Sequence, residues 1–115
     1  MIFTPEEEKW LKANSEKIER MSVLEIKNYY DQFLPSYAFR DQLAILVAYL
    51  RGEDFYIKKV SGEYCLCTKE ARLISLRLDV FGLSRIKEDL REKLIDYGIP
   101  ENIRWKIIDN VKIKR

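Results

Sequence analysis

The chain has 115 residues, of which 47% are hydrophobic and 35% are charged, and its formal net charge is +2. This composition is typical of a globular protein, and the length fits a single domain, residues 1–115, with one core. The sequence has no histidine. Catalysis by serine–histidine or cysteine–histidine pairs, histidine metal ligation and a histidine pH switch are therefore excluded.

The sequence also argues against a membrane location. The longest uncharged apolar run, residues 43–50, is far shorter than the roughly 20 residues that a membrane-spanning helix needs. The first four residues lead directly into acidic residues, without the basic and then apolar segment of a secretory signal. We therefore expect a cytoplasmic protein with no membrane partner.

The two cysteines, Cys65 and Cys67, face the same side if they lie on a strand. A disulfide between them would be strained, and one C-x-C pair without histidine cannot complete a four-ligand zinc site. We expect two reduced, half-buried thiols; a reactive thiol or an intermolecular metal site is the alternative. No glycine-rich phosphate loop or nucleophile motif occurs, so we expect neither enzymatic activity nor a cofactor.

Capping signals mark three helices in the first half of the chain. Thr4, Pro5 and Glu7 form a strong helix start, which predicts a helix over residues 5–20. A second capping box at Ser22 begins another helix.

The second helix should end near Phe33, because Pro35 disfavours helical geometry at Leu34. Ser36 can cap a third helix, which is apolar enough to be mostly buried and which ends at Gly52.

Alternating side chains follow this glycine. Residues 54–60 and 63–68 read as two strands joined at Ser61 and Gly62, where the glycine suits a tight hairpin. Residues 69–81 alternate as a third strand, although Thr68 could also start a helix there.

The C-terminal part of the chain again has a helical pattern. A helix that begins at Ser84 should end at Gly98. Residues 100–110 fit a helix better than a strand, with a frayed basic tail after them. The predicted fold class is therefore α+β, with three N-terminal helices, an antiparallel hairpin or three-stranded meander, and one or two C-terminal helices.

The segment from Leu50 to Leu66 contains Leu-Arg and a glycine, then an aliphatic strand, and then a second glycine before Tyr64-x-Leu66. In this pattern it resembles the wing of winged-helix repressors, most closely the DNA-binding domain fused to biotin-protein ligases. The resemblance covers about residues 20–68, and Leu34-Pro35-Ser36 corresponds to the turn of a helix-turn-helix.

The resemblance implies that the third helix enters the major groove of double-stranded DNA, with Ser36, Tyr37, Arg40, Asp41 and Ala44 exposed. This face is poor in the basic and amide side chains that usually contact DNA. Lysines of the wing and of the basic tail would contact phosphates. The candidate nucleic-acid-binding residues are therefore Ser36, Tyr37, Arg40, Lys58, Lys59, Lys112 and Lys114.

The charge distribution agrees with this hypothesis without requiring it. Residues 69–115 carry twelve basic and eight acidic residues, a net charge of +4. Scattered surface lysines are a common alternative explanation. The leading hypothesis is a small, non-enzymatic, nucleic-acid-binding regulator; the alternative is a protein-interaction module, acting on a protein partner or by self-association, that does not touch DNA.

Overall fold

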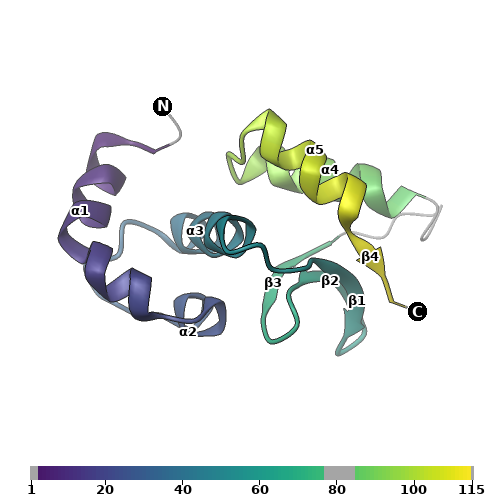
Figure 1. Ribbon diagram of the computed structural model, residues 1–115, viewed down its shortest axis with the longest axis horizontal. Coiled ribbons are helices and arrows are strands. Elements are labelled where there is room, and N and C mark those ends of the chain that lie inside the picture. The colour runs from purple at the N-terminus through teal and green to yellow at the C-terminus, as the bar shows by residue number, and fades with distance from the viewer. Residues whose placement is uncertain (1–2, 77–84, 115) are drawn as a thin grey trace.

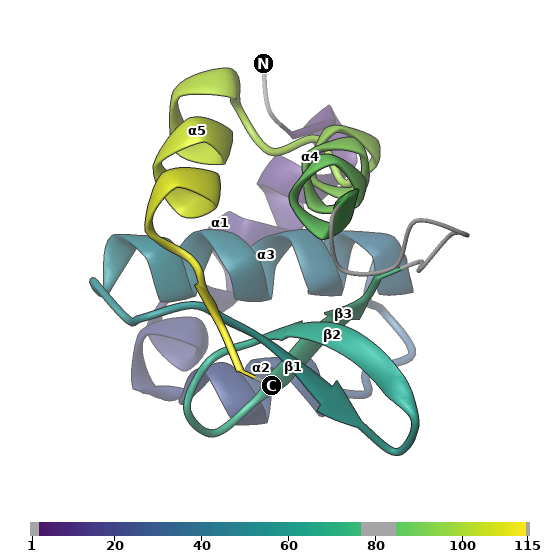
Figure 2. The ribbon, with the colours of Figure 1, turned by 90° about the vertical axis from the view of Figure 1, so that its right-hand side faces the viewer.

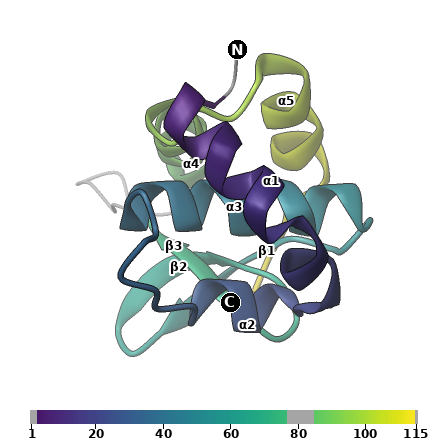
Figure 3. The same cartoon turned by 90° about the vertical axis from the view of Figure 1, so that its left-hand side faces the viewer.

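The computed structural model describes residues 3–76 and 85–114 and confirms the α+β class. Helix α3 runs through the middle of the molecule (Figure 1), with α1 and α2 on one side and the sheet on the other. Helices α4 and α5 lie together over α3 and the sheet (Figures 2 and 3). In chain order the elements are α1 (Pro5–Arg20), α2 (Val23–Lys27), α3 (Tyr37–Leu50), β1 (Tyr56–Val60), β2 (Glu63–Cys67), β3 (Arg72–Ser75), α4 (Ile86–Asp96), α5 (Glu101–Asn110) and β4 (Lys112–Ile113).

The first two helices begin where the capping signals predict. The hydroxyl of Thr4 accepts a hydrogen bond from the Glu7 amide, and the Glu7 carboxylate accepts one from the Thr4 amide. Ser22 and Glu25 form the same reciprocal pair before α2. Each capping box satisfies two backbone groups that the helix leaves without a partner.

Helix α2 is shorter than the sequence predicts, because it ends at Lys27 and not near Phe33. The carboxylate of Asp31 accepts hydrogen bonds from the Phe33 amide (2.8 Å) and from the Tyr29 hydroxyl (2.7 Å). An aspartate that binds the backbone two residues later favours a turn over a helix. The Phe33 side chain is 74% exposed in this turn.

Helix α3 is capped by Ser36, as predicted, and its residues 42–46 are all buried. At its other end, Arg51 donates hydrogen bonds to the carbonyls of Met21 (2.7 Å) and Ile18 (3.3 Å). These carbonyls lie at the end of α1 and at its C-cap residue Met21, where a helix leaves backbone acceptors only partly satisfied. Arg51 therefore fixes the end of α1 against the end of α3.

The hairpin has the predicted tight turn. Val60 pairs with Glu63, and the two residues between them, Ser61 and Gly62, have φ values of 52° and 85°. Positive φ at both positions defines the turn that matches the twist of a hairpin. The third strand, β3, confirms the strand reading of residues 72–75, whereas residues 77–81 lie outside the described part of the chain.

Helices α4 and α5 follow the predicted pattern, although the expected start at Ser84 falls outside the described residues. The basic tail is not frayed as expected, because it forms β4, which pairs with β1 in parallel. The amides of Lys112 and Lys114 donate to the carbonyls of Phe55 (3.1 Å) and Ile57 (2.8 Å). The sheet order is therefore β3-β2-β1-β4.

Apolar side chains from both ends of the chain meet around α3. Strand residues with buried side chains, such as Ile57 and Leu66, belong to the same cluster as Trp10 of α1 and Leu90 of α4. No helix in the described ranges is long and apolar enough to cross a membrane.

A larger side chain at position 44 tests how tightly α3 is enclosed, because Ala44 is fully buried. We expect Ala44→Leu to lower the free energy of unfolding by about 1–3 kcal/mol, since added methylene groups in a packed core force side chains out of their rotamers. The same substitution at exposed Ala38 of this helix is the matched control. Equal urea-unfolding midpoints for the two variants would contradict the enclosure of α3.

Candidate functional site

The sheet has one face toward the helices and one open face. Residues that pair across strands share a face, which places Ile57 with Leu66 on the buried side and Lys58 with Cys65 on the other. Tyr56 pairs with Lys112 on this second face. None of the described helices lies across it (Figure 2), and we call it the outer face.

Lysines gather around Tyr56 on the outer face. The ammonium groups of Lys114 and Lys112 lie 5.1 and 5.7 Å from the centre of the Tyr56 ring. Lys58, Lys69 and Lys114 line a shallow hollow of about 460 Å³ together with Tyr56 and Asp54. We call Lys58, Lys69, Lys112 and Lys114 the outer lysine cluster.

Carboxylates lie on one side of the cluster, because Glu53, Asp54 and Glu70 line a neighbouring hollow together with Tyr56 and Lys69. Asp54 lies 3.7 Å from the ammonium group of Lys112, and both side chains are more than half exposed. An ion pair this open contributes little, because water and salt screen it. The lysines therefore remain available to an anionic partner.

The two cysteines also belong to the outer face, since Cys67 pairs with Tyr56 and Cys65 with Lys58. They are free thiols and are fully buried rather than half-buried. Burial raises the pKa of the Cys67 thiol, although the positive charge of Lys58 opposes the shift. A thiol protonated in this way is a poor nucleophile and metal ligand.

The structure brings together only some of the seven candidate residues. Lys58, Lys112 and Lys114 meet in the outer lysine cluster. Lys59 lies on the opposite face of β1, 6.0 Å from the Tyr64 ring. Adjacent residues of a strand point to opposite faces, so Lys58 and Lys59 cannot act on one surface.

The start of α3 is arranged differently from the expectation. The Ser36 hydroxyl is used as the helix cap, and Tyr37 is 65% exposed. Ala44, expected on an exposed groove-reading face, is completely buried. The reason is that residues around the end of α4 cover this face: the Tyr97 hydroxyl donates to Asp41, and Gln42 donates to the Gly98 carbonyl.

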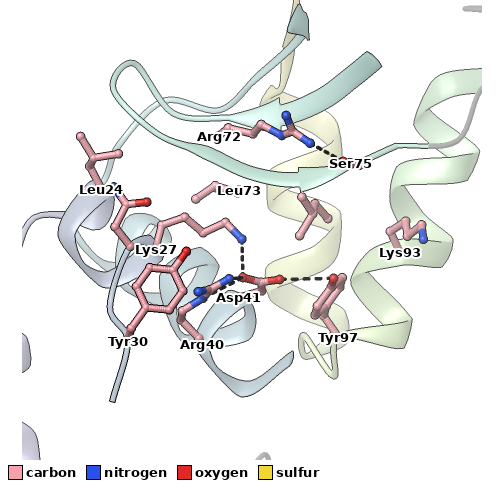
Figure 4. Close-up of a pocket in the computed structure, with 12 residues that line it drawn as sticks. Leu24, Lys27, Tyr30, Arg40, Asp41, Arg72, Leu73, Ser75, Lys93 and Tyr97 are labelled. Atoms are coloured by element: carbon pink, nitrogen blue, oxygen red, sulfur yellow. Dashed lines mark hydrogen bonds and ion pairs between the residues drawn. The ribbon is translucent and has the colours of Figure 1, made fainter. Parts of the chain in front are cut away.

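A second cationic site lies between α2, α3, β3 and α4 (Figure 4), and we call it the Arg40 pocket. Its centre is the Asp41 carboxylate, which binds the ammonium group of Lys27 and accepts a hydrogen bond from Tyr97 (3.4 Å). The side chains of Asp41 and Lys27 are 14% and 17% exposed. The full lining is Leu24, Lys27, Asn28, Tyr30, Arg40, Asp41, Arg72, Leu73, Ile74, Ser75, Lys93 and Tyr97.

The sequence singled out only Arg40 of the four cations in this pocket. Lys27, Arg72 and Lys93 come from α2, β3 and α4, and no local motif connects them. The pairing of Asp41 with a tyrosine 56 residues later is likewise a tertiary contact. Sequence spacing therefore carried no signal for this site.

No family model matches the chain, and neither the curated proteins nor the solved structures include a significant match. The likeness of residues 20–68 to winged-helix domains remains an expectation drawn from the sequence. A functional assignment must consequently be argued from the geometry of the side chains.

The pKa of Tyr97 depends on the surroundings of its hydroxyl in the Arg40 pocket. Burial raises the pKa of its phenol, and the neighbouring Asp41 carboxylate raises it further. The pKa of Tyr97 is higher in the folded chain than in the unfolded chain, so its protonated phenol contributes to the free energy of unfolding below pH about 10. This contribution is lost as the pH rises through the folded-state pKa.

We expect Asp41→Asn to bring the Tyr97 pKa down toward its ordinary value, since the negative charge is removed while burial remains. Titration of the tyrosine ring carbons by NMR measures this change. Asp31→Asn is the matched control, because that aspartate binds Tyr29 and not Tyr97. An unchanged Tyr97 titration in Asp41→Asn would show that the two groups are not coupled.

Proposed function

We propose that this protein is a small, non-enzymatic, nucleic-acid-binding protein that contacts a single strand through the outer face of its sheet. One observation carries the proposal: strand β4 brings Lys112 and Lys114 beside Tyr56, in the same cluster as Lys58 and Lys69. Lysine ammonium groups bind backbone phosphates, and this contact supplies most of the affinity in non-specific complexes.

The aromatic ring favours a single strand over a duplex. Unpaired bases stack on exposed aromatic side chains of open sheets, while neighbouring basic residues follow the backbone. Tyr56 is partly exposed between the lysines and can serve as such a platform. Double-stranded DNA is less well supported, because the expected reading helix, α3, is enclosed.

The proposed setting is the cytoplasm, and the proposed role is regulatory. Both cysteines are free thiols, which suits a reducing compartment. A regulator of this kind acts by occupying a strand rather than by chemical change.

A binding experiment tests the proposal with Lys58→Gln/Lys114→Gln and a fluorescent single-stranded oligonucleotide that carries no terminal phosphate. We expect wild-type affinity to fall steeply with salt. The double variant should lower the slope of log K against log salt by about 1.4, since each phosphate contact on a single strand contributes about 0.7. Fluorescence anisotropy measures both quantities.

The matched control, Lys12→Gln/Lys87→Gln, removes the same charge from exposed positions on α1 and α4. It should leave the slope unchanged. The proposal fails if wild type does not bind at low salt, or if the control variant loses as much affinity as the double variant.

Exposed aromatic side chains favour a protein-interaction module as the second candidate. Tyr30 and Phe33 are each 74% exposed and Tyr37 is 65% exposed. The rings of Tyr30 and Tyr37 contact each other edge-on, with their centres 6.4 Å apart. Tyrosine and phenylalanine are enriched in protein interfaces, where their burial provides much of the binding energy.

Self-association is the simplest form of this alternative to measure. If these aromatic residues form a dimer interface, wild type should sediment with a concentration-dependent mass, and Phe33→Ser/Tyr37→Ser should sediment as a monomer. Leu50→Ser, at another exposed apolar position, is the control. A wild-type protein that stays monomeric at all concentrations would remove self-association from consideration.

A further inference from the structure

The Arg40 pocket has an excess of positive charge. Lys27, Arg40, Arg72 and Lys93 line it, whereas Asp41 is the one acidic residue among the described residues of its lining, which gives these side chains a formal charge of +3. Its volume is about 440 Å³, within the range of small-molecule sites. Asp41 is already engaged by Lys27 and Tyr97, and Arg72 pairs with the Glu63 carboxylate at 3.3 Å. The excess positive charge therefore lies mainly on Arg40 and Lys93.

Arg40 is only partly satisfied. Its side chain is only 12% exposed, and its Nε and Nη1 atoms are buried without a hydrogen-bond acceptor. Nε lies 3.5 Å from the Asp41 carboxylate, but the geometry is not that of a hydrogen bond. The third nitrogen, Nη2, does donate to the Asp41 carboxylate (3.5 Å). Buried donors are nearly always paired, so the two remaining donor atoms of Arg40 indicate a missing acceptor in the cavity.

Two aromatic rings hold the guanidinium of Arg40 in place. Its central carbon lies 5.4 Å from the ring centre of Tyr30 and 5.1 Å from that of Tyr37. These contacts stabilise the positive charge, although a ring offers no lone pair to the N–H groups. Tyr30 is also part of the pocket lining, so its ring lies beside both the cation and the cavity.

We propose that the Arg40 pocket binds a small phosphomonoester. Its phosphate group would lie among Lys27, Arg40 and Arg72, and its organic part against Tyr30 and Leu24. A phosphomonoester carries a charge of about −1.5 to −2 at neutral pH and three acceptor oxygens, which suits a cavity lined by several cations better than a carboxylate does.

This inference does not depend on the proposed function, because the outer lysine cluster and the Arg40 pocket share no residue. The same chemistry has two sources, a free phosphorylated small molecule or the terminal phosphate of a nucleic-acid strand. Isothermal titration of the whole chain with separate probes distinguishes them.

Adenosine 5′-monophosphate is the first probe, with adenosine and inorganic sulfate as comparisons. We expect the nucleotide to bind more tightly than either by about tenfold or more, because only it supplies both a phosphate dianion and an aromatic body. Equal binding of sulfate and the nucleotide, or no binding of the nucleotide at millimolar concentration, would overturn the proposal.

Two variants locate the site. Arg40→Gln should weaken nucleotide binding by about tenfold, since charge-assisted hydrogen bonds are lost. Arg72→Gln/Lys93→Gln should do the same from more exposed positions, where folding is less at risk. Lys59→Gln/Lys87→Gln removes equal charge from outside the pocket and is the control. Unaltered affinity in a folded Arg72→Gln/Lys93→Gln variant would refute the assignment.

The source of the phosphate is tested in the Lys58→Gln/Lys114→Gln background, where binding to the outer face is weakened. A single strand with a 5′-phosphate that binds more tightly than the same strand without it identifies a strand end as the ligand. Equal, weak binding of the two strands together with tight nucleotide binding identifies a free small molecule. If none of the phosphorylated probes binds, this inference is wrong, and the outer-face proposal is unaffected.

Discussion

The burial of α3 is the constraint on which the rest of the structure depends. Residues 42–46, more than one full turn of this helix, are all buried, so its middle is covered on every side. Helices α1 and α2, the sheet, and the pair α4 and α5 each cover one part of its surface (Figures 1 and 3). A helix enclosed in this way builds the core, and among its described residues only those near its two ends are exposed. Binding surfaces must therefore be formed by the elements around it.

The covering elements place positive charge in two different environments. In the outer lysine cluster the cations are long, exposed side chains that water and salt screen, so they can lie together at little cost. In the Arg40 pocket the cations are partly removed from water, where repulsion between like charges is stronger. Asp41 compensates part of that repulsion, and Glu63 pairs with the more exposed Arg72. Both surfaces attract anions, but only the pocket has a shape that selects a small one.

The formal net charge is only +2, yet the chain has two cationic surfaces. Both are possible because several acidic residues are held elsewhere, in local structural roles. Glu7 and Glu25 complete the capping boxes, and Asp31 fixes the turn after α2. Each of these carboxylates is bound to backbone amides of its own segment, which fixes its position along the chain. The cations of the outer lysine cluster and of the Arg40 pocket come from separate elements, so their distribution is set by how these elements pack. Local folding thus keeps these acids on the helix caps and turns.

The sequence by itself determined the order of elements, the capped helix starts, the Ser61-Gly62 turn and the α+β class, because each depends on atoms a few residues apart. It predicted part of the outer lysine cluster, because Lys58 lies in a recognisable strand. Only the tertiary structure decided that the tail bearing Lys112 pairs with β1, that α3 is enclosed, and that Arg40 meets cations from three other elements. Those outcomes depend on contacts between distant segments, such as the one that joins Asp41 to a tyrosine 56 residues later. Periodicity and spacing describe one segment at a time, and so they do not specify which faces of different segments meet.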